Sequence, residues 1–271
     1  MIPKRVGDRL ARSIGKFQQV LKLAKDRDVN ESDTVSIIRD MLAEVFGYDK
    51  HLEVTSEFAI RGTYCDLAIK LDNKVEFLIE VKAIGSGLKE FHLRQAIDYG
   101  AREGVPWVIL TSGLVWQVYK IRGGMPIAYD LVCEFTFAEL DPKNEEHQER
   151  LFILCKEGLV KDAREEFHEK ILTFNRFILG ALMLGDEVVG VIRRELRKLS
   201  AGVLVTPEEI TQLLSNEVLK RDVLDGEEAA KAQSRVRRFY EKATRRTRES
   251  STDKPGGESE EPTEPGGQQS V

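Results

Sequence analysis

The chain has 271 residues, of which 41% are hydrophobic and 32% are charged, and its formal net charge is −5 at pH 7. This length and apolar fraction suit a globular protein of one large domain or two small ones. The net negative charge lies after residue 248, where six acids accompany one lysine, so residues 1–248 are neutral. A neutral body excludes the overall basic signature of a dedicated DNA-binding protein. Local basic stretches at 4–25 and 231–248 either contact phosphates or form solvated helix faces.

Cysteine spacing and apolar run lengths exclude further classes of protein. Cys65, Cys133 and Cys155 lack C-x-x-C spacing and lie in apolar surroundings. We expect buried free thiols in a reducing compartment, not disulfides or a zinc site. No apolar signal segment precedes the first helical pattern, and the longest apolar run, 177–185, is too short to span a bilayer. We therefore expect a cytoplasmic protein without a membrane partner.

The first part of the chain has two helical patterns and three strand patterns. Residues 4–27 carry one apolar stripe, which predicts an amphipathic helix within an N-terminal segment, 1–28. A second helix is predicted to begin after the N-cap Asn30 and to stop at Gly47. Strands follow at 53–59, 64–71 and 75–82, and the turn signal at 71–74 joins the last two into a hairpin.

The middle of the chain predicts the rest of an α/β core. A helix at 88–103 is followed by a buried strand, 106–111, and by a strand at 114–121 that pairs with it through a tight turn. One more strand is predicted at 127–137. The bulky residues Phe77, Trp107 and Trp116 sit in apolar strand patterns and are expected in the core. The order of elements predicts a mixed central sheet flanked by helices, in a domain covering 29–140.

Beyond residue 140 the periodicity is helical throughout. Helices are predicted at 145–156, 161–179 and 186–199. Thr206-Pro207-Glu208-Glu209 is a capping box with proline at the first helical position, so another helix begins there and runs to about 220. A last basic helix ends near 248. We expect an all-α region at 141–248 and a disordered acidic tail at 249–271, which lacks the apolar residues needed for a core.

Three charged residues interrupt the predicted hairpin. Asp66 opens an apolar stretch, and Glu80 and Lys82 close another. Residues two apart on a strand share a face at a separation of roughly 6.6 Å, and charges on the buried side are costly unless they are paired. A divalent cation held by Asp66 and Glu80 would supply the partner. Carboxylate oxygens suit Mg²⁺ or Mn²⁺, with the Val81 carbonyl as a third ligand.

The pattern of Asp66, thirteen residues, and Glu80-x-Lys82 resembles the active site of the PD-(D/E)XK nuclease superfamily. Gln95 and Tyr99 in the following helix match the Gln-x-x-x-Tyr element of its exonuclease-like branch. That resemblance implies that both residues support the metal–lysine cluster or the scissile phosphate. Without it, charged residues on a surface hairpin, a glutamine near a helix boundary and a half-buried tyrosine would be the alternative interpretation.

A wider resemblance, over about 29–137, is to the N-terminal nuclease domain of type I restriction enzyme R subunits. It is carried by Asn30-Glu31-Ser32-Asp33-Thr34, by Phe46-Gly47-Tyr48-Asp49 and by residues 109–116. It implies a restriction-endonuclease-like fold and metal-dependent hydrolysis of DNA in restriction or defence. Cys65 stands where the superfamily name has proline. No Walker A pattern occurs in the sequence, so we expect no ATP-driven motor.

Three further residues have two interpretations each. Glu31 either reaches a second metal position or complements the helix dipole. His92 is a site residue or an ordinary half-buried histidine, and Arg61 touches phosphate or lies on the surface.

Two functions also stay open. One is a metal-dependent DNA nuclease in which Lys82 orients water or stabilises charge. The other is an inactive nuclease-derived module that binds nucleic acid, or a protein partner through the C-terminal helices.

Overall fold

The structure is a computed structural model that describes residues 2–60, 63–200, 202 and 204–251. The chain divides into two compact units, Met1–Leu172 and Thr173–Val271. The first unit therefore contains the predicted sheet together with the helices that precede and follow it. Of the predicted tail, 249–251 belong to the last helix, and 252–271 lie outside the described residues, as does Arg61.

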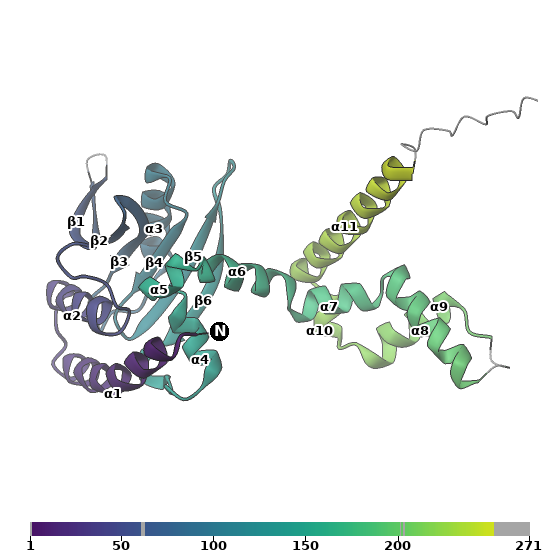
Figure 1. The fold of residues 1–271 in the computed structure, drawn as a ribbon, viewed down its shortest axis with the longest axis horizontal. Helices are drawn as coiled ribbons and strands as arrows, with labels where there is room; N and C mark the ends of the chain where they lie inside the picture. The colour runs from purple at the N-terminus through teal and green to yellow at the C-terminus, as the bar shows by residue number, and fades with distance from the viewer. Residues whose placement is uncertain (1, 61–62, 201, 203, 252–271) are drawn as a thin grey trace, which may run out of the picture. The chain divides into compact units, whose positions relative to one another are not determined.

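The first unit is built on a six-stranded sheet whose spatial order follows the chain (Figure 1). Its strands are β1 (Val54–Ile60), β2 (Thr63–Leu71), β3 (Lys74–Val81), β4 (Trp107–Thr111), β5 (Val115–Arg122) and β6 (Ala128–Thr136). β3 and β4 are parallel, and the other neighbouring pairs are antiparallel. Parallel neighbours need a crossover, and helix α3 (Glu90–Glu103) provides it. The predicted α/β class with a mixed sheet is confirmed.

The β2–β3 hairpin is defined by its turn and by one register shift. Asp72 and Asn73 both have positive φ, 49° and 63°, as a two-residue type I′ turn requires. Leu71 and Lys74 pair on either side of it, the register then shifts by one residue between Ile69 and Lys70, and beyond the shift Leu67 pairs with Ile79. This register brings the residue before Leu67 and the residue after Ile79, two carboxylates, to the same end of the sheet.

Helices cover both faces of the sheet. Helices α1 (Lys4–Asp26) and α2 (Glu31–Glu44) share the main core with strand residues such as Leu67 and Ile79. Ala68 and Leu78, which point the other way, pack with Tyr99 of α3. Phe77, Trp107 and Trp116 are buried, as predicted. The three cysteines are buried and free, as predicted, and burial raises the pKa of each thiol to about 12.

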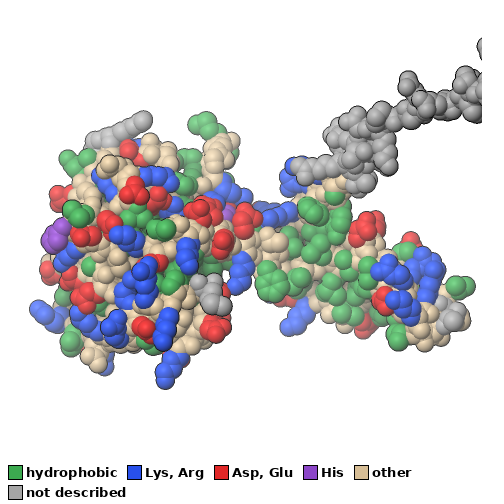
Figure 2. Space-filling model, in the orientation of Figure 1, with side chains coloured by type: hydrophobic (Ala, Val, Ile, Leu, Met, Phe, Trp, Pro, Cys, Tyr) green, Lys and Arg blue, Asp and Glu red, His purple; other side chains and the backbone are tan. Residues whose placement is uncertain are grey.

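Short helices complete the first unit, namely η1 (Phe137–Glu139), α4 (Glu145–Phe152), α5 (Lys156–Val160) and α6 (Ala163–Thr173). A buried polar network attaches α6 to the sheet. Arg164 pairs with Glu76 and lies over the rings of Phe77 and Trp107. His168 contacts Asp130 at 3.1 Å. On the face seen in Figure 2, cations and acids are interspersed over this unit, in keeping with its neutral composition.

The second unit is helical, with α7 (Arg176–Met183), α8 (Asp186–Leu199), α9 (Pro207–Leu213), η2 (Leu214–Val218), α10 (Arg221–Leu224) and α11 (Glu227–Ser251). Val189, Ile210 and Leu214 form a small core cluster. The capping box is confirmed, since Thr206 Oγ1 accepts from Glu209 N and Glu209 accepts in return from Thr206 N. Across the described ranges, no helix is long and apolar enough to cross a membrane.

Two predicted helices were wrong in extent, and a third was confirmed with an irregular end. The helix predicted at 145–156 ends at Phe152, and α5 begins separately at Lys156. The helix predicted at 161–179 is interrupted because the Asn175 side chain accepts hydrogen bonds from two following backbone N–H groups and begins α7. The helix that begins at Pro207 widens into a π-helical turn at Leu214 and ends at Val218.

Candidate active site

Asp66 lies where the regular pairing of β2 with β3 stops. The ladder ends at Leu67 and Ile79. Just beyond it, Asp66 Oδ2 accepts a hydrogen bond of 2.7 Å from the backbone N–H of Val81. The carboxylate therefore takes the place of a strand carbonyl and is held against the end of β3. Burial raises the pKa of Asp66, although the Val81 N–H and the charge of Lys82 both act to lower it.

Glu80 is the most buried acid of the site, with 2% of its side chain exposed. Its Oε1 accepts a hydrogen bond of 2.8 Å from Lys82 Nζ. Its Oε2 is buried and has no hydrogen-bond partner among the described residues. Burial and the negative charge of Asp66 raise the pKa of Glu80 to about 7, and the contact with Lys82 offsets this only in part. Glu80 thus has an acceptor that the protein does not use.

Lys82 lies between two acids. Its Nζ is 2.8 Å from Glu80 Oε1 and 3.6 Å from Glu31 Oε2. Burial by itself would lower the pKa of Lys82, but the hydrogen bond to Glu80 and the charges of the neighbouring acids raise it above its ordinary value. Lys82 therefore keeps its proton. One cation faces three carboxylates, Glu31, Asp66 and Glu80, which leaves an excess of negative charge.

Glu31 reaches the site because the start of α2 is tied to the loop after β3. Asn30 Oδ1 caps the helix by accepting from Asp33 N, as predicted. Thr34 Oγ1, one turn into the helix, accepts from the N–H of Ile84 in that loop. Gly85 lies so close to this segment that a Cβ there would be 2.3 Å from a carboxylate oxygen of Asp28. The role of Thr34 in holding α2 to this loop was not predicted from the sequence, where the only signal was its position in the first helical turn.

Gln95 and Tyr99 contact each other. Gln95 Nε2 donates a hydrogen bond of 2.7 Å to Tyr99 Oη, and the Tyr99 ring packs against β2 and β3. Over the described residues, neither side chain hydrogen-bonds to Asp66, Glu80 or Lys82. The contact of Tyr99 with Leu78 shows that α3 packs on the face of the sheet that carries Leu78. A direct supporting role of Gln95 and Tyr99 at the metal–lysine cluster or the phosphate stays a prediction.

His92 has a structural contact of its own. Its Nδ1 accepts a hydrogen bond of 3.1 Å from the backbone N–H of Lys89 and so caps the start of α3. Burial lowers the pKa of His92, and the nearby positive charge of Lys82 lowers it further. A neutral imidazole that accepts at Nδ1 satisfies these conditions. Cys65, beside Asp66, is also tied to the backbone, since its thiol donates to the Ile79 carbonyl at 3.2 Å.

The residues present fit a divalent cation at Asp66 and Glu80. Within the part of the chain that the structure describes, no three His, Cys, Asp or Glu side chains already converge as a metal cluster. Mg²⁺, however, commonly binds through one or two carboxylates and keeps several waters. The unused Oε2 of Glu80 and the excess negative charge are what such an ion would satisfy. The Val81 carbonyl as a ligand stays a prediction.

Comparisons of this chain with protein-family models, with curated proteins and with solved structures find no match. The fold defines an α/β protein, and the site defines a cluster of three carboxylates around one lysine, of which Glu80 is buried, Asp66 is half-buried and Glu31 is exposed. Function is therefore inferred from these residues and their contacts.

Proposed function

We propose that the protein is a metal-dependent endonuclease that hydrolyses phosphodiester bonds of DNA at a site formed by Asp66, Glu80 and Lys82, in restriction or defence. The observation that carries the proposal is Glu80, a buried carboxylate with an unused oxygen beside a second acid and a lysine. A buried acceptor without a partner costs about 1–3 kcal/mol. A bound cation would remove that cost, because it would pair with the free Glu80 oxygen.

Asp66 and Glu80 would hold Mg²⁺ or Mn²⁺, with Glu31 and the Val81 carbonyl as further oxygen donors. When bound, such an ion polarises the phosphate and lowers the pKa of the attacking water. The chain itself prepares this arrangement. The Val81 N–H fixes one Asp66 oxygen, and Lys82 fixes one Glu80 oxygen, so in each acid one oxygen is oriented by the protein.

Lys82 is suited to charge stabilisation. Because its pKa is raised, it stays protonated and is a poor proton acceptor. An ammonium group fixed beside the carboxylates stabilises the negative charge that develops on the phosphate oxygens, and it can orient a water by donating to it. Gln95 and Tyr99 support the site indirectly. Their hydrogen bond holds the Tyr99 side chain in the position in which its ring packs on β2 and β3, the strands that carry the acids.

Cleavage assays with Mn²⁺ test the proposal. The parent is expected to cleave single- or double-stranded DNA. Lys82→Ala should cleave at least about a hundredfold more slowly, since one charge-stabilising donor contributes on that order, while Mn²⁺ binding is retained because the lysine is not a ligand. Lys70→Ala, on the same hairpin but away from the acids, is the matched control and should cleave like the parent.

Two results would contradict the proposal. If Lys82→Ala is folded and cleaves as fast as the parent, the site is not catalytic. If the folded parent cleaves neither single- nor double-stranded DNA with Mn²⁺, the protein is not a nuclease, and a module that only binds nucleic acid or a protein partner replaces it.

A further inference from the structure

A second charged site lies at the opposite end of α2 from Glu31. A pocket with a volume of about 570 Å³ opens between α1, the end of α2 and α5. Its charged lining residues are Arg5, Arg9, Arg12, Lys156, Lys161 and Glu157. Five cations thus face one carboxylate, in a chain in which acids outnumber lysines and arginines by 46 to 41. The fourteen residues of α2 separate this pocket from the candidate active site by roughly 20 Å.

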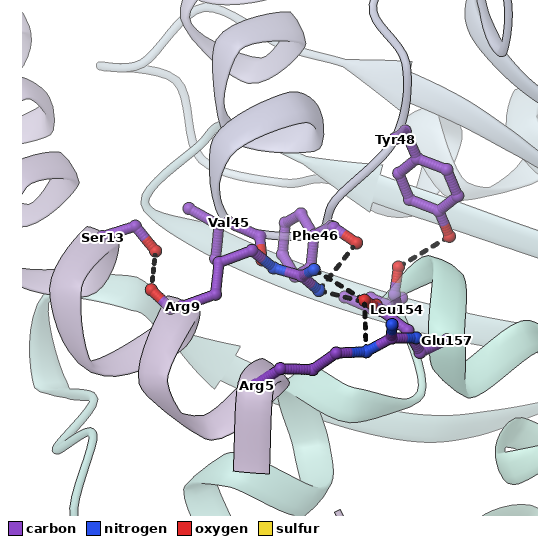
Figure 3. A network of polar contacts seen from close by, with 8 residues as sticks. All are labelled: Arg5, Arg9, Ser13, Val45, Phe46, Tyr48, Leu154 and Glu157. Carbon is purple, nitrogen blue, oxygen red and sulfur yellow. Dashed lines mark hydrogen bonds and ion pairs between the residues drawn. The ribbon is translucent and has the colours of Figure 1, made fainter. Parts of the chain in front are cut away.

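One cation of the pocket is fixed and already neutralised (Figure 3). Arg9 binds Glu157 through both guanidinium ends, at 2.8 and 2.7 Å. It also donates to the carbonyls of Val45 and Phe46 at the end of α2. Gly47, with φ +85°, passes so close that a Cβ would lie 2.5 Å from the guanidinium. Arg9 is therefore a structural part of the pocket wall, and its positive charge neutralises the negative charge of Glu157.

The other cations differ in their pairing. Lys156 pairs with Glu53. Arg5, with 77% of its side chain exposed, reaches Glu157 only at 4.0 Å. Arg12 donates to a backbone carbonyl, that of Asp8, and among the described residues neither Arg12 nor Lys161 pairs with a carboxylate. Three positive charges therefore remain around one concavity without a full counter-charge. Such a concentration of one sign attracts anions.

We infer that this pocket binds a small ligand carrying phosphate groups, of about the size of a nucleotide. Arginine forks match phosphate oxygens in geometry, and lysine adds a mobile point charge. The pocket volume lies within the range of about 300–1,000 Å³ that holds small molecules. Val160, 75% exposed, and Pro3 give the rim an apolar side for the rest of such a ligand. The cations come from two separate helices and face one hollow, whereas a nucleic-acid backbone is bound along an extended basic stripe.

Titration calorimetry on the full chain tests this inference. The probes are inorganic triphosphate and ATP, at constant ionic strength and with EDTA to remove divalent metal. We expect saturable binding at one site. Arg12→Ala and Lys161→Ala should each weaken binding about tenfold, as the loss of a charged phosphate contact does, and the double variant should bind at least tenfold more weakly than either. Both side chains are exposed, so the variants should melt at the temperature of the parent.

Lys22→Ala is the matched control, because Lys22 is an exposed cation of the same helix outside the pocket. The inference is overturned if triphosphate and ATP show no saturable binding, or if Lys22→Ala weakens binding as much as Arg12→Ala. A single-stranded oligonucleotide of twelve residues is the third probe. If it binds more tightly than ATP, with the same losses in the Arg12 and Lys161 variants, the phosphate belongs to a nucleic-acid backbone and the small-ligand inference is wrong.

Discussion

Glu76 and Glu80 lie four residues apart on β3, yet their carboxylates differ in hydrogen bonding and in the direction of their pKa shifts. Burial alone would raise the pKa of Glu76, but hydrogen bonds from Lys74 and Arg164 lower it below its ordinary value. Burial and the charge of Asp66 raise the pKa of Glu80 to about 7, and one Glu80 oxygen has no partner among the described residues. Glu76 is fully paired, and Glu80 is not.

The comparison separates a structural carboxylate from one with spare binding capacity. The buried one of the two partners of Glu76 is a guanidinium that is itself held over two aromatic rings, 5.1 Å from the Phe77 centroid and 5.4 Å from that of Trp107. That network attaches α6 to the sheet, and Lys74 and Arg164 occupy both oxygens of Glu76, so the buried atoms without a partner in it, Arg164 Nε and His168 Nδ1, are nitrogens and not cation ligands of the carboxylate type. The partner of Glu80 is a lysine shared with Glu31, so the local charge is not balanced. A cation-binding role is therefore expected at Glu80 and not at Glu76.

The largest expected effect is on the paired carboxylate. Arg164→Ala should lower the free energy of unfolding by up to about 3–5 kcal/mol, because it removes the buried partner of Glu76, leaving only the exposed Lys74, and empties the space over the rings of Phe77 and Trp107. Urea unfolding followed by the fluorescence of Trp107 and Trp116 measures this. Arg94→Ala, which breaks a solvent-exposed pair with Glu90, is the control and should unfold at nearly the same urea concentration as the parent. A loss below about 1 kcal/mol for Arg164→Ala would show that the network is not structural.

The unpaired carboxylate should show itself in the pH dependence of stability. The folded-state pKa of Glu80, about 7, lies above its ordinary value of 4.5. The folded protein therefore binds this proton more tightly than the unfolded chain does. The stabilisation is fully present below pH 4.5 and is lost as the pH rises through 7. At about 1.36 kcal/mol per pKa unit, the loss is about 3 kcal/mol at most.

Glu80→Gln removes this titration. In EDTA, the free energy of unfolding of the parent should fall between pH 4.5 and 7 relative to that of Glu80→Gln, and urea unfolding at several pH values measures the difference. Titrating groups that lie away from Glu80 cancel in that difference. A constant difference between the two proteins across this range would contradict the assignment of Glu80 as a poorly compensated acid.

Asp66→Asn tests whether the spare capacity is used by a metal. Replacing one anionic oxygen with an amide should weaken Mn²⁺ binding at least about tenfold, measured by calorimetry. The amide oxygen of the variant can still accept a hydrogen bond from the Val81 N–H, so the fold should persist. Unchanged Mn²⁺ affinity would remove Asp66 from the set of ligands.

The smallest effect is expected at Gln95. Gln95→Ala loses one partly exposed hydrogen bond to Tyr99, so stability should fall by about 0.5–1 kcal/mol. Cleavage by this variant should be slower than in the parent but much faster than in Lys82→Ala. Equal losses of cleavage in Gln95→Ala and Lys82→Ala would mean that Gln95 contacts the reacting groups directly.

Local signals in the sequence determined much of the fold and the centre of the candidate site. The turn signal predicted the β2–β3 hairpin, but the register shift between Ile69 and Lys70, which brings Asp66 next to Glu80 and Val81, was not predicted. Helix caps at Asn30 and Thr206 were readable because capping uses residues within three positions of each other. The helix break at Asn175 was missed because apolar spacing continues through it, whereas the structure gives Asn175 an extended backbone and lets its side chain cap the next helix.

Only the tertiary structure decided which charges far apart in the sequence are paired. The partner of Glu76 is 88 residues away in α6, and the partner of Arg9 is 148 residues away in α5. No local pattern connects such positions, since their contact depends on how helices pack on the sheet. The same packing brings Glu31 to Lys82 and leaves one oxygen of Glu80 buried without a donor among the described residues. Residue types and spacing thus set the hairpin chemistry, while burial and long-range pairing made one glutamate structural and left the other available.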